Sequence, residues 1–138
     1  MKLDALWITG FVDGEGCFYV GINKHIEMTT GYQVLPEFTV VQHKRDIQIL
    51  YALKDYFGCG VVRTNHGDRW AYRVRSIFDL SEIIVPFFIK YPLKSKKFLD
   101  FEKFRKILEM MKKGEHMGLK GIQNIKNLST QMNRGSLR

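Results

Sequence analysis

Residues 8–16 read Ile-Thr-Gly-Phe-Val-Asp-Gly-Glu-Gly and close a segment that we expect to be helical. Asp4 can cap this helix, because its side chain can accept a hydrogen bond from a backbone N–H of the first turn. The helix is predicted over residues 5–13, and the glycines at 14 and 16 are expected to stop it. Four residues recur at spacings of three and four and therefore share one helix face: Leu3, Trp7, Gly10 and Gly14.

Two acids, Asp13 and Glu15, stand where this helix ends. The helix macrodipole already places about half a negative charge there, so basic residues are the favoured neighbours. No Lys or Arg occurs in the eight residues after Glu15. The charge partner is therefore either a distant side chain or a divalent cation, and carboxylate and backbone oxygens suit Mg²⁺. The ordinary alternative is a polar glycine turn whose acids are solvated.

Gly10 and Gly14 lie four residues apart on one helix face. Two missing side chains in register allow a second helix to approach closely, as small residues do in tight helix pairs. The natural partner is the same helix of a second copy, related by a two-fold axis. This homodimer would bring two Glu15 carboxylates together. Its interface would consist of Trp7, Gly10, Phe11 and Gly14. The competing explanation is a helix that rests on its own sheet.

The segments that follow predict two β-hairpins separated by a helix. Alternating apolar residues predict four strands, which span residues 18–22, 34–40, 61–65 and 70–75. Asp46 is expected to cap a helix over residues 47–57, and Gly58 is expected to end it.

The rest of the chain is predicted to be helical. A helix from Asp79 must break or kink at Pro86, because proline lacks a backbone N–H, and the expected pieces are 80–85 and 87–90. Ser95 is expected to cap a long helix over residues 96–113 that ends at Gly114, with a buried stripe of Leu99, Phe104, Ile107, Leu108 and Met111. A last helical pattern, over 119–132, belongs to a C-terminal extension, 115–138, whose end we expect to be loose.

This order predicts an α+β fold, αββαββα, in which a curved antiparallel four-stranded sheet is backed by helices. The 138 residues, 45% of them hydrophobic, are expected to form a single domain, 1–138. The composition does not fit a disordered chain or a disulfide scaffold, so Cys17 and Cys59 are expected to be reduced thiols. No apolar run approaches the roughly 18 residues that span a bilayer, and the N-terminus is unlike a signal peptide. We therefore expect a soluble intracellular protein without a membrane partner.

The net charge of +8 is unevenly distributed. Residues 1–57 carry −2, whereas residues 58–97 and 98–138 carry +5 each. Regional positive charge in a basic protein favours a polyanionic partner, of which nucleic acid is the commonest. The alternative is a basic composition that reflects an AT-rich genome.

With these elements in place, residues 8–16 resemble the motif of the LAGLIDADG homing endonucleases, in the form that carries one motif and works as a homodimer. The resemblance covers most of the chain. Besides the element order, it rests on Gln42 at the end of the second strand, Gly-Cys-Gly at 58–60 and Pro-Leu-Lys-Ser-Lys at 92–96.

The resemblance implies roles for several residues. Glu15 would bind the catalytic divalent metal at the subunit interface, the Gly14 carbonyl would be a further ligand, and Asp13 would be a structural acid. Gln42 would orient a metal-bound water, and Lys96, or its neighbour Lys94, would lie near the scissile phosphate. The ordinary alternatives for these last residues are a strand-end amide and solvated lysines. The implied metal is Mg²⁺, with Mn²⁺ able to replace it and Ca²⁺ able to bind without supporting cleavage.

The resemblance also implies a basic residue after Gln42, but no single residue of this sequence corresponds to it clearly. Asp46 falls near that register, and Lys44 or Arg45 is the substitute.

Sequence recognition would fall to the sheet face opposite the apolar one. Arg, Asn and Gln can form bidentate contacts with guanine or adenine in the major groove, and Glu can accept from the cytosine amine. Leu35, Val41 and Ala71 could touch thymine methyl groups. The candidate DNA-binding residues are Tyr19, Asn23, Lys24, Gln33, Leu35, Glu37, Thr39, Lys44, Arg63, Asn65, Arg69, Arg73 and Arg75. Further phosphate contacts are expected from Lys94, Lys97, Lys120 and Lys126. The alternative is an ordinary solvent-facing sheet surface.

A strand of seven to nine residues spans about 23 to 30 Å, slightly less than one turn of DNA at about 34 Å. One subunit would therefore read about eight to ten base pairs, and a dimer about 20 base pairs of a pseudo-palindromic double-stranded site.

The function that the resemblance implies is a sequence-specific DNA endonuclease that cuts both strands and leaves short 3′ overhangs. Two alternatives remain open at this point: an intron RNA maturase on the same fold, and a non-cleaving DNA-binding regulator. The family further implies an intron-encoded protein of an organelle, chloroplast or mitochondrion, with a prokaryotic cytoplasm as the alternative location.

Overall fold

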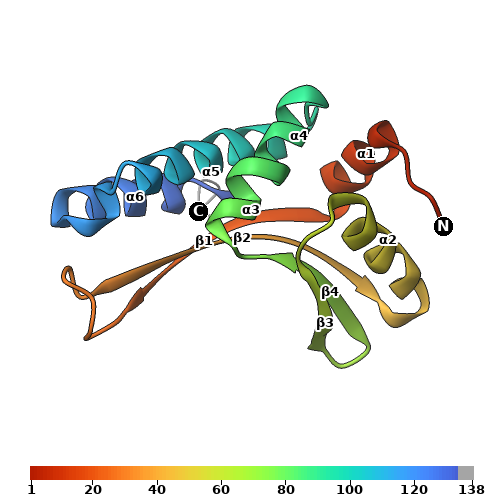
Figure 1. Ribbon diagram of the computed structural model, residues 1–138, viewed down its shortest axis with the longest axis horizontal. Coiled ribbons are helices and arrows are strands. Elements are labelled where there is room, and N and C mark those ends of the chain that lie inside the picture. Colours follow the sequence, from red (N-terminus) through yellow and green to blue (C-terminus); the bar gives the residue numbers. More distant parts are fainter. Residues whose placement is uncertain (134–138) are drawn as a thin grey trace.

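The computed structural model describes residues 1–133 and contains one antiparallel sheet with helices against one of its faces (Figure 1). The strands are β1 (Gly16–Lys24), β2 (Tyr32–His43), β3 (Val61–His66) and β4 (Arg69–Val74). They lie in the order β1-β2-β4-β3, so the two predicted hairpins join through β2 and β4. The predicted α+β class, element order and four-stranded sheet are confirmed.

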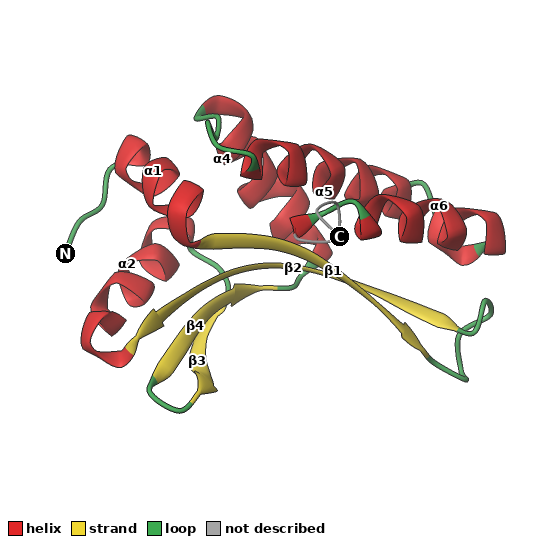
Figure 2. Cartoon of the chain, turned by 180° about the vertical axis from the view of Figure 1, so that it is seen from behind, coloured by secondary structure: helices red, strands yellow, loops and turns green. Residues whose placement is uncertain are grey.

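The sheet is strongly curved, and α5 (Lys97–Lys112) and α6 (Leu119–Thr130) lie on its convex side (Figure 1). Helices α1 (Ala5–Glu15) and α2 (Ile47–Phe57) lie together near one end of the sheet (Figure 2). The concave face is left free of helices in both views. Because successive side chains of a strand alternate between faces, each strand presents one set of residues to the helices and the other to the concave face.

The core lies between the convex side of the sheet and the helices. Phe18 of β1 is fully buried, and its ring lies 5.1 to 5.6 Å from the rings of Phe38, Phe88, Phe101 and Phe104. Tilted and edge-on aromatic pairs at such separations are favourable, and each large ring removes much apolar area from water. This cluster fixes β1, and therefore the end of α1 that precedes it, against the helical layer.

Helix α1 begins as predicted and ends later. The Asp4 carboxylate accepts a hydrogen bond from the Trp7 amide at 3.0 Å, which confirms the cap. Gly14 lies inside the helix, which continues to Glu15 before Gly16 opens β1. Glycine is tolerated within a helix, so it stops one only where the chain needs a conformation that other residues avoid.

The predicted cap of α2 is wrong. Asp46 makes no side-chain capping bond, and a 3-10 turn, η1 (Lys44–Asp46), precedes the helix. His43 caps this turn instead, since its Nδ1 accepts a hydrogen bond from the Arg45 amide at 3.1 Å. Gly58 ends α2 as predicted, with a left-handed φ of 70°.

A break or kink was predicted at Pro86, in a helix beginning at Asp79; the segment instead begins earlier, stays helical through Pro86, and changes helix type just before it. It starts at Ser76, whose hydroxyl accepts from the Asp79 amide, and passes through α3 (Ile77–Asp79), a π-helical turn η2 (Leu80–Ile84) and α4 (Val85–Lys90). The Val85 amide bonds to the Leu80 carbonyl, five residues back. This wider turn directly precedes the proline, which lies in the first turn of α4.

The C-terminal helices follow the predicted spans closely. Ser95 assists the start of α5, because its hydroxyl accepts from the Lys97 amide at 3.2 Å. Of the predicted stripe, Phe104, Ile107 and Leu108 are buried, whereas Leu99 is exposed. A short turn η3 (Glu115–Met117) leads into α6. The predicted loose end falls on residues 134–138, which lie outside the described residues. Within residues 1–133 no helix combines the length and apolar character needed to cross a bilayer.

Candidate functional site

Asp13 fastens the end of α1 to the loop that precedes α5. Its carboxylate accepts hydrogen bonds from the Lys94 amide at 2.8 Å, the Ser95 amide at 3.0 Å and the Ser95 hydroxyl at 2.6 Å. Burial raises the pKa of Asp13, but these hydrogen bonds and the nearby Lys97 ammonium outweigh it, and the pKa lies below its ordinary value. The carboxylate is therefore held charged and oriented.

Lys97 is the cation that the end of α1 was expected to need. Its ammonium donates to the Val12 carbonyl at 3.1 Å and to the Gly16 carbonyl. A positive charge among the last carbonyls of a helix offsets the macrodipole, and the Val12 carbonyl accepts from Lys97 in addition to the Gly16 amide. Of the two alternatives, a distant side chain fills this role. The Lys97 amine, a candidate phosphate contact in the sequence, is turned toward the backbone instead.

Glu15 is different from Asp13. Glu15 and Gly14 are both exposed, and among the ion pairs of residues 1–133 none involves Glu15. No group of three or more His, Cys, Asp or Glu side chains that could hold a metal ion occurs in the part of the chain that the structure describes. One copy of the chain therefore offers an exposed acid but not a complete set of metal ligands.

The other candidate catalytic residues lie on segments that adjoin the end of α1. Gly16 pairs with Val40, so Gln42 lies two residues beyond that pair on β2, which contacts α1. The Gln42 side chain donates from Nε2 to the Val41 carbonyl at 2.9 Å. Lys94 and Lys96 are exposed on the loop that Asp13 holds. Three elements thus bring an acid, an amide and two amines to one end of the sheet.

The outer face of α1 carries the candidate dimer residues. Ile8 and Val12 are fully buried, so the helix packs on its own core through this other face. Gly10 and Gly14 are exposed, and a Cβ added at either would meet nothing within 4 Å. Packing within the chain therefore does not require glycine at these positions. The exposed Trp7 ring stacks on Phe11 beside them, with centroids 4.8 Å apart.

The concave face of the sheet holds most of the candidate DNA-binding residues. The strand registers place Cys17, Tyr19, Gly21 and Asn23 of β1 opposite Thr39, Glu37, Leu35 and Gln33 of β2, and align Arg73 with Thr39. Tyr19, Asn23, Leu35, Arg63, Asn65, Arg69 and Arg75 are exposed. Ala71 is on this face but is fully buried, so its methyl group is not available to a thymine. Lys120 and Lys126 lie on α6, across the sheet from the concave face.

Two pairs on the concave face are already hydrogen-bonded. Arg75 donates from Nε to Glu37 at 2.6 Å, and Arg73 donates from an Nη to the Asn65 amide oxygen at 2.9 Å. The carboxylate expected to accept from a cytosine therefore contacts an arginine in this structure.

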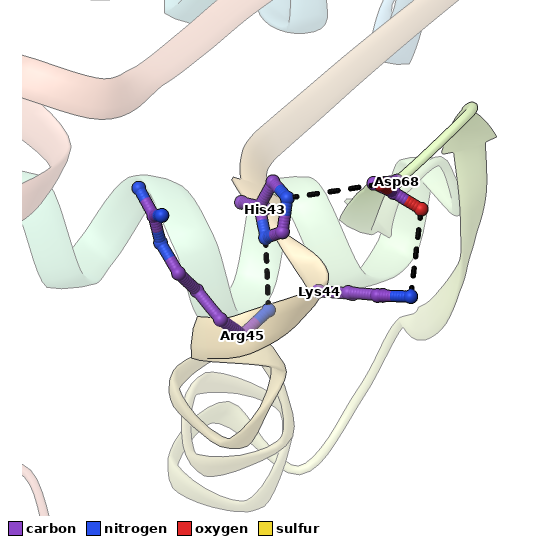
Figure 3. A network of polar contacts seen from close by, with 4 residues as sticks. All are labelled: His43, Lys44, Arg45 and Asp68. Carbon is purple, nitrogen blue, oxygen red and sulfur yellow. Dashed lines mark hydrogen bonds and ion pairs between the residues drawn. The ribbon is translucent and has the colours of Figure 1, made fainter.

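Figure 3 shows a further network, where β2 ends and the β3–β4 turn approaches it. Lys44 and His43 both face Asp68, at 3.6 Å from the lysine Nζ and 3.9 Å from the histidine Nε2. Because these groups are exposed, the pairing is worth little in itself. It nevertheless ties the β3–β4 hairpin to β2, and the sequence patterns did not indicate His43 in this role.

The two cysteines are partly buried and are free thiols. Burial raises the pKa of both the Cys17 and the Cys59 thiol, which favours the neutral S–H form. Burial likewise raises the pKa of Tyr72, whose hydroxyl donates to the Cys59 carbonyl at 3.0 Å. These groups are structural in this fold.

This fold and this site define a class of protein. The family model described as LAGLIDADG endonuclease matches residues 8–108, and the chain belongs to that family. The match begins in α1 and ends in α5, so it includes the acidic helix end, the whole sheet and the lysine loop.

Individual relatives support the same assignment. The crystal structure of the homing endonuclease I-TnaI is 57% identical in sequence with a TM-score of 0.93, and the match covers 96% of this chain and 90% of that one. The I-SmaMI LAGLIDADG homing endonuclease bound to cleaved DNA is 36% identical with a TM-score of 0.95, covering 97% and 45%. A probable intron-encoded endonuclease of Neurospora crassa is 32% identical over 135 residues, covering 96% and 30%.

The relatives differ in how much of their length this fold occupies. The chain spans between 25% and 30% of the first three curated relatives it matches and under half of I-SmaMI, but 90% of I-TnaI. The unit described here therefore occurs both as nearly a whole chain and as part of a longer one.

Proposed function

We propose that this chain is one subunit of a sequence-specific endonuclease that hydrolyses both strands of double-stranded DNA with a divalent metal. The observation that carries the proposal is the exposed, open pair Gly10 and Gly14 next to the exposed Glu15. A second copy of α1 packed on this face would place two Glu15 carboxylates side by side. The relatives named as homing and intron-encoded endonucleases support the same activity.

The residues at the end of α1 fit a hard divalent cation. Glu15 provides an exposed carboxylate and Gly14 a backbone carbonyl, and oxygen ligands of this kind are those that Mg²⁺ prefers. One chain supplies too few ligands, so the second Glu15 and phosphate oxygens of DNA would complete the set. When bound, the metal would activate water and neutralise charge that builds on the phosphate. We propose Mg²⁺, with Mn²⁺ as an active substitute and Ca²⁺ as a non-cleaving one; I-SmaMI has been solved with uncleaved DNA in the presence of calcium ions.

Other residues of the chain would act on water and phosphate. Gln42, on β2 beside α1, would orient the attacking water through its amide. Lys96 and Lys94 would donate to the scissile phosphate, since the loop that carries them is fixed by Asp13. Asp13 itself is a positioning residue, because its oxygens are occupied by that loop.

The concave face would lie along the DNA and read about eight to ten base pairs in each half of a pseudo-palindromic site. Its arginines and amides would contact base edges, while Lys24, Lys44 and Arg69 would contact phosphates. Symmetric cleavage near the two-fold axis would leave short 3′ overhangs. We place the gene in an organellar intron, because two relatives are named as probable intron-encoded endonucleases and another as a protein in intron 1 of ND4.

The first prediction concerns Glu15. Purified protein incubated with Mg²⁺ and a plasmid library of candidate insertion sites should yield linear product, and EDTA should abolish it. Glu15→Gln should lower cleavage by at least about 1000-fold, because removing the metal-binding charge removes much of the transition-state stabilisation. Its DNA binding, measured by gel shift in Ca²⁺, should remain within about threefold of the wild-type value.

The control is Glu109→Gln, which neutralises an exposed acid on α5 and should leave both readings unchanged. Cleavage by Glu15→Gln at the wild-type rate would refute the assigned role. Binding of structured intron RNA with no linear product from any library member would instead support the maturase alternative. Operator-like DNA binding without any metal-dependent cleavage would support the regulator.

A further inference from the structure

Glu37 occupies a central position on the concave face. It lies in the middle of β2 opposite Tyr19 of β1, and the register that pairs Phe38 with Val74 places it in line with Arg75, just past β4. Its side chain is 17% exposed, whereas that of Arg75 is 62% exposed. The carboxylate is therefore set into the sheet surface while the guanidinium extends outward from it.

The contact between the two leaves a defined part of the guanidinium free. Arg75 donates to Glu37 through Nε, at 2.6 Å. A charge-assisted bond of this length restrains the orientation of the planar group. The outer N–H of each terminal amino group points away from the side-chain stem, and these two donors can form a bidentate contact with O6 and N7 of guanine.

The sheet leaves room for a base edge beside this pair. A hollow of about 240 Å³ is lined by Tyr19, Gly21, Asn23, Leu35, Pro36, Glu37 and Arg75. At Gly21 a Cβ would lie 3.3 Å from the Tyr19 ring, so the absent side chain keeps this hollow open. The ion pair thus stands at a concave, accessible place rather than under other side chains.

We propose that Glu37 is a positioning residue that sets base preference by holding Arg75 ready to read a guanine in the major groove. The inference rests on the proposed function and assigns Glu37 a role through Arg75 instead of a direct contact with cytosine. Glu37 lies three residues along β2 from Val40, the partner of Gly16. Three residues of strand span about 10 Å, so the guanine belongs to the inner half of each half-site.

Arg73 provides an internal comparison. It lies two residues before Arg75 and is held by Asn65, through a neutral amide and a terminal Nη. With a terminal amino group already engaged, Arg73 has fewer donors left for a bidentate contact. The two arginines are about 7 Å apart along the strand, so they would read different base pairs.

The test is a selection from randomised duplex DNA, with the full chain, in Ca²⁺, followed by sequencing of the bound fraction. Arg75→Ala should lower a guanine preference about tenfold at one position of each half-site. Glu37→Ala should lower it to the same extent at the same position, while total DNA affinity rises because a negative charge has been removed. A purely structural role would lower affinity and preference together.

Two further variants separate positioning from other effects. Glu37→Gln keeps an oxygen that can accept from Nε, so it should retain most of the preference. The double variant Glu37→Ala, Arg75→Ala should lose no more preference than Arg75→Ala alone, because residues that act as one unit are not additive. Asn65→Ala, which removes the partner of Arg73, is the matched control. It should alter base preference at a different position of the half-site.

Two results would overturn the inference and leave the proposed function standing. One is an unchanged guanine preference in Glu37→Ala, and the other is an additive loss in the double variant. If the wild-type protein enriches no sequence at all, the proposed function fails, and this inference fails with it.

Discussion

Two residues fasten the end of α1 to the start of α5, one on each of the two helices. Asp13 accepts three hydrogen bonds from the loop at Lys94 and Ser95, and Lys97 donates to carbonyls of the helix end. Both contacts join segments about eighty residues apart in sequence, so they fix the lysine loop relative to the exposed Glu15. Glu15, the proposed metal ligand, is therefore positioned by Asp13 and Lys97, which we do not propose as metal ligands.

Asp13→Ala is predicted to destabilise the fold. It leaves two backbone amides and a hydroxyl without their acceptor, and hydrogen bonds to charged groups are each worth about 1.5 to 3 kcal/mol. Because the site is partly solvated, we expect a loss of about 2 kcal/mol in the free energy of unfolding, measured by urea denaturation at pH 7. Asp4→Ala, which removes one capping bond at the other end of α1, should cost about 1 kcal/mol.

A loss below about 0.5 kcal/mol for Asp13→Ala would contradict this account of the helix end. Asp13→Ala should also slow cleavage, since the Lys94–Lys96 loop loses its anchor, whereas Asp4→Ala should not. The comparison thus separates the position of the loop from stability in general.

The sequence indicated part of this residue-level arrangement. Two acids at a helix end implied a cationic partner, and the distant side chain proved to be Lys97. Periodicity could not identify which of the neighbouring lysines would reach α1, because that depends on how the α4–α5 loop docks. His43 was missed because a histidine at a strand end carries no capping pattern of its own.

At the scale of elements, the link between α2 and β3 depends on two glycines that have different constraints. Gly58 and Gly60 both have positive φ, 70° and 85°. A Cβ at Gly58 would meet nothing within 4 Å, whereas one at Gly60 would lie 2.7 Å from the Arg73 carbonyl and from the Tyr72 ring. A side chain at Gly58 would therefore strain only the backbone conformation, whereas one at Gly60 would also clash with β4.

Gly60→Ala should therefore destabilise more than Gly58→Ala. A left-handed conformation costs a non-glycine residue about 1 to 2 kcal/mol, which is the whole effect expected at Gly58. At Gly60 the clash with backbone should raise the total above about 3 kcal/mol, measured as the difference in thermal and urea unfolding between the variants. Equal losses would show that β4 does not pack on this turn as described.

Prediction from sequence was accurate for elements where local pattern and packing agree. Gly58 was predicted to end α2 and does so in the left-handed conformation. The alternation of apolar and polar residues correctly predicted the strands. Prediction failed where tertiary context decides. The helical segment that contains Pro86 is not broken, because a π-helical turn precedes the proline. No residue pattern distinguishes such a turn from a break in the helix. Leu99 has the period of the buried stripe but lies at the exposed start of α5.

At the scale of the whole molecule, the curved sheet separates two surfaces. Helices cover the convex side, where the aromatic core lies (Figure 1). The strand residues of the concave side include exposed arginines and amides. Helix α1 lies at one end of the sheet (Figure 2), and its last turn, which ends at Glu15, is hydrogen-bonded to the loop at Lys94 and Ser95. A partner copy on the exposed face of α1 would extend the concave surface into a continuous one twice as long.

The sequence could predict the sheet backed by helices because its two hairpins and its helices each carry a clear pattern. The sequence could not show that Gly10 and Gly14 face away from the chain's own core. This orientation favours a partner helix over the alternative, in which the glycines pack on the chain's own sheet. Nor could alternation alone show that Glu37 and Arg75 meet, since the pair depends on the register between β2 and β4.

Sedimentation equilibrium at micromolar concentration, for the wild type and Gly10→Leu, measures whether two copies of the chain associate through α1. The wild type should have twice the 16.2 kDa of one chain. Because Gly10 is exposed and a Cβ there meets nothing within 4 Å, Gly10→Leu should stay folded, lose at least about tenfold in dimer affinity and lose DNA cleavage with it. A wild type that is monomeric both free and on DNA, or a Gly10→Leu variant that dimerises and cleaves like the wild type, would contradict the shared two-acid centre.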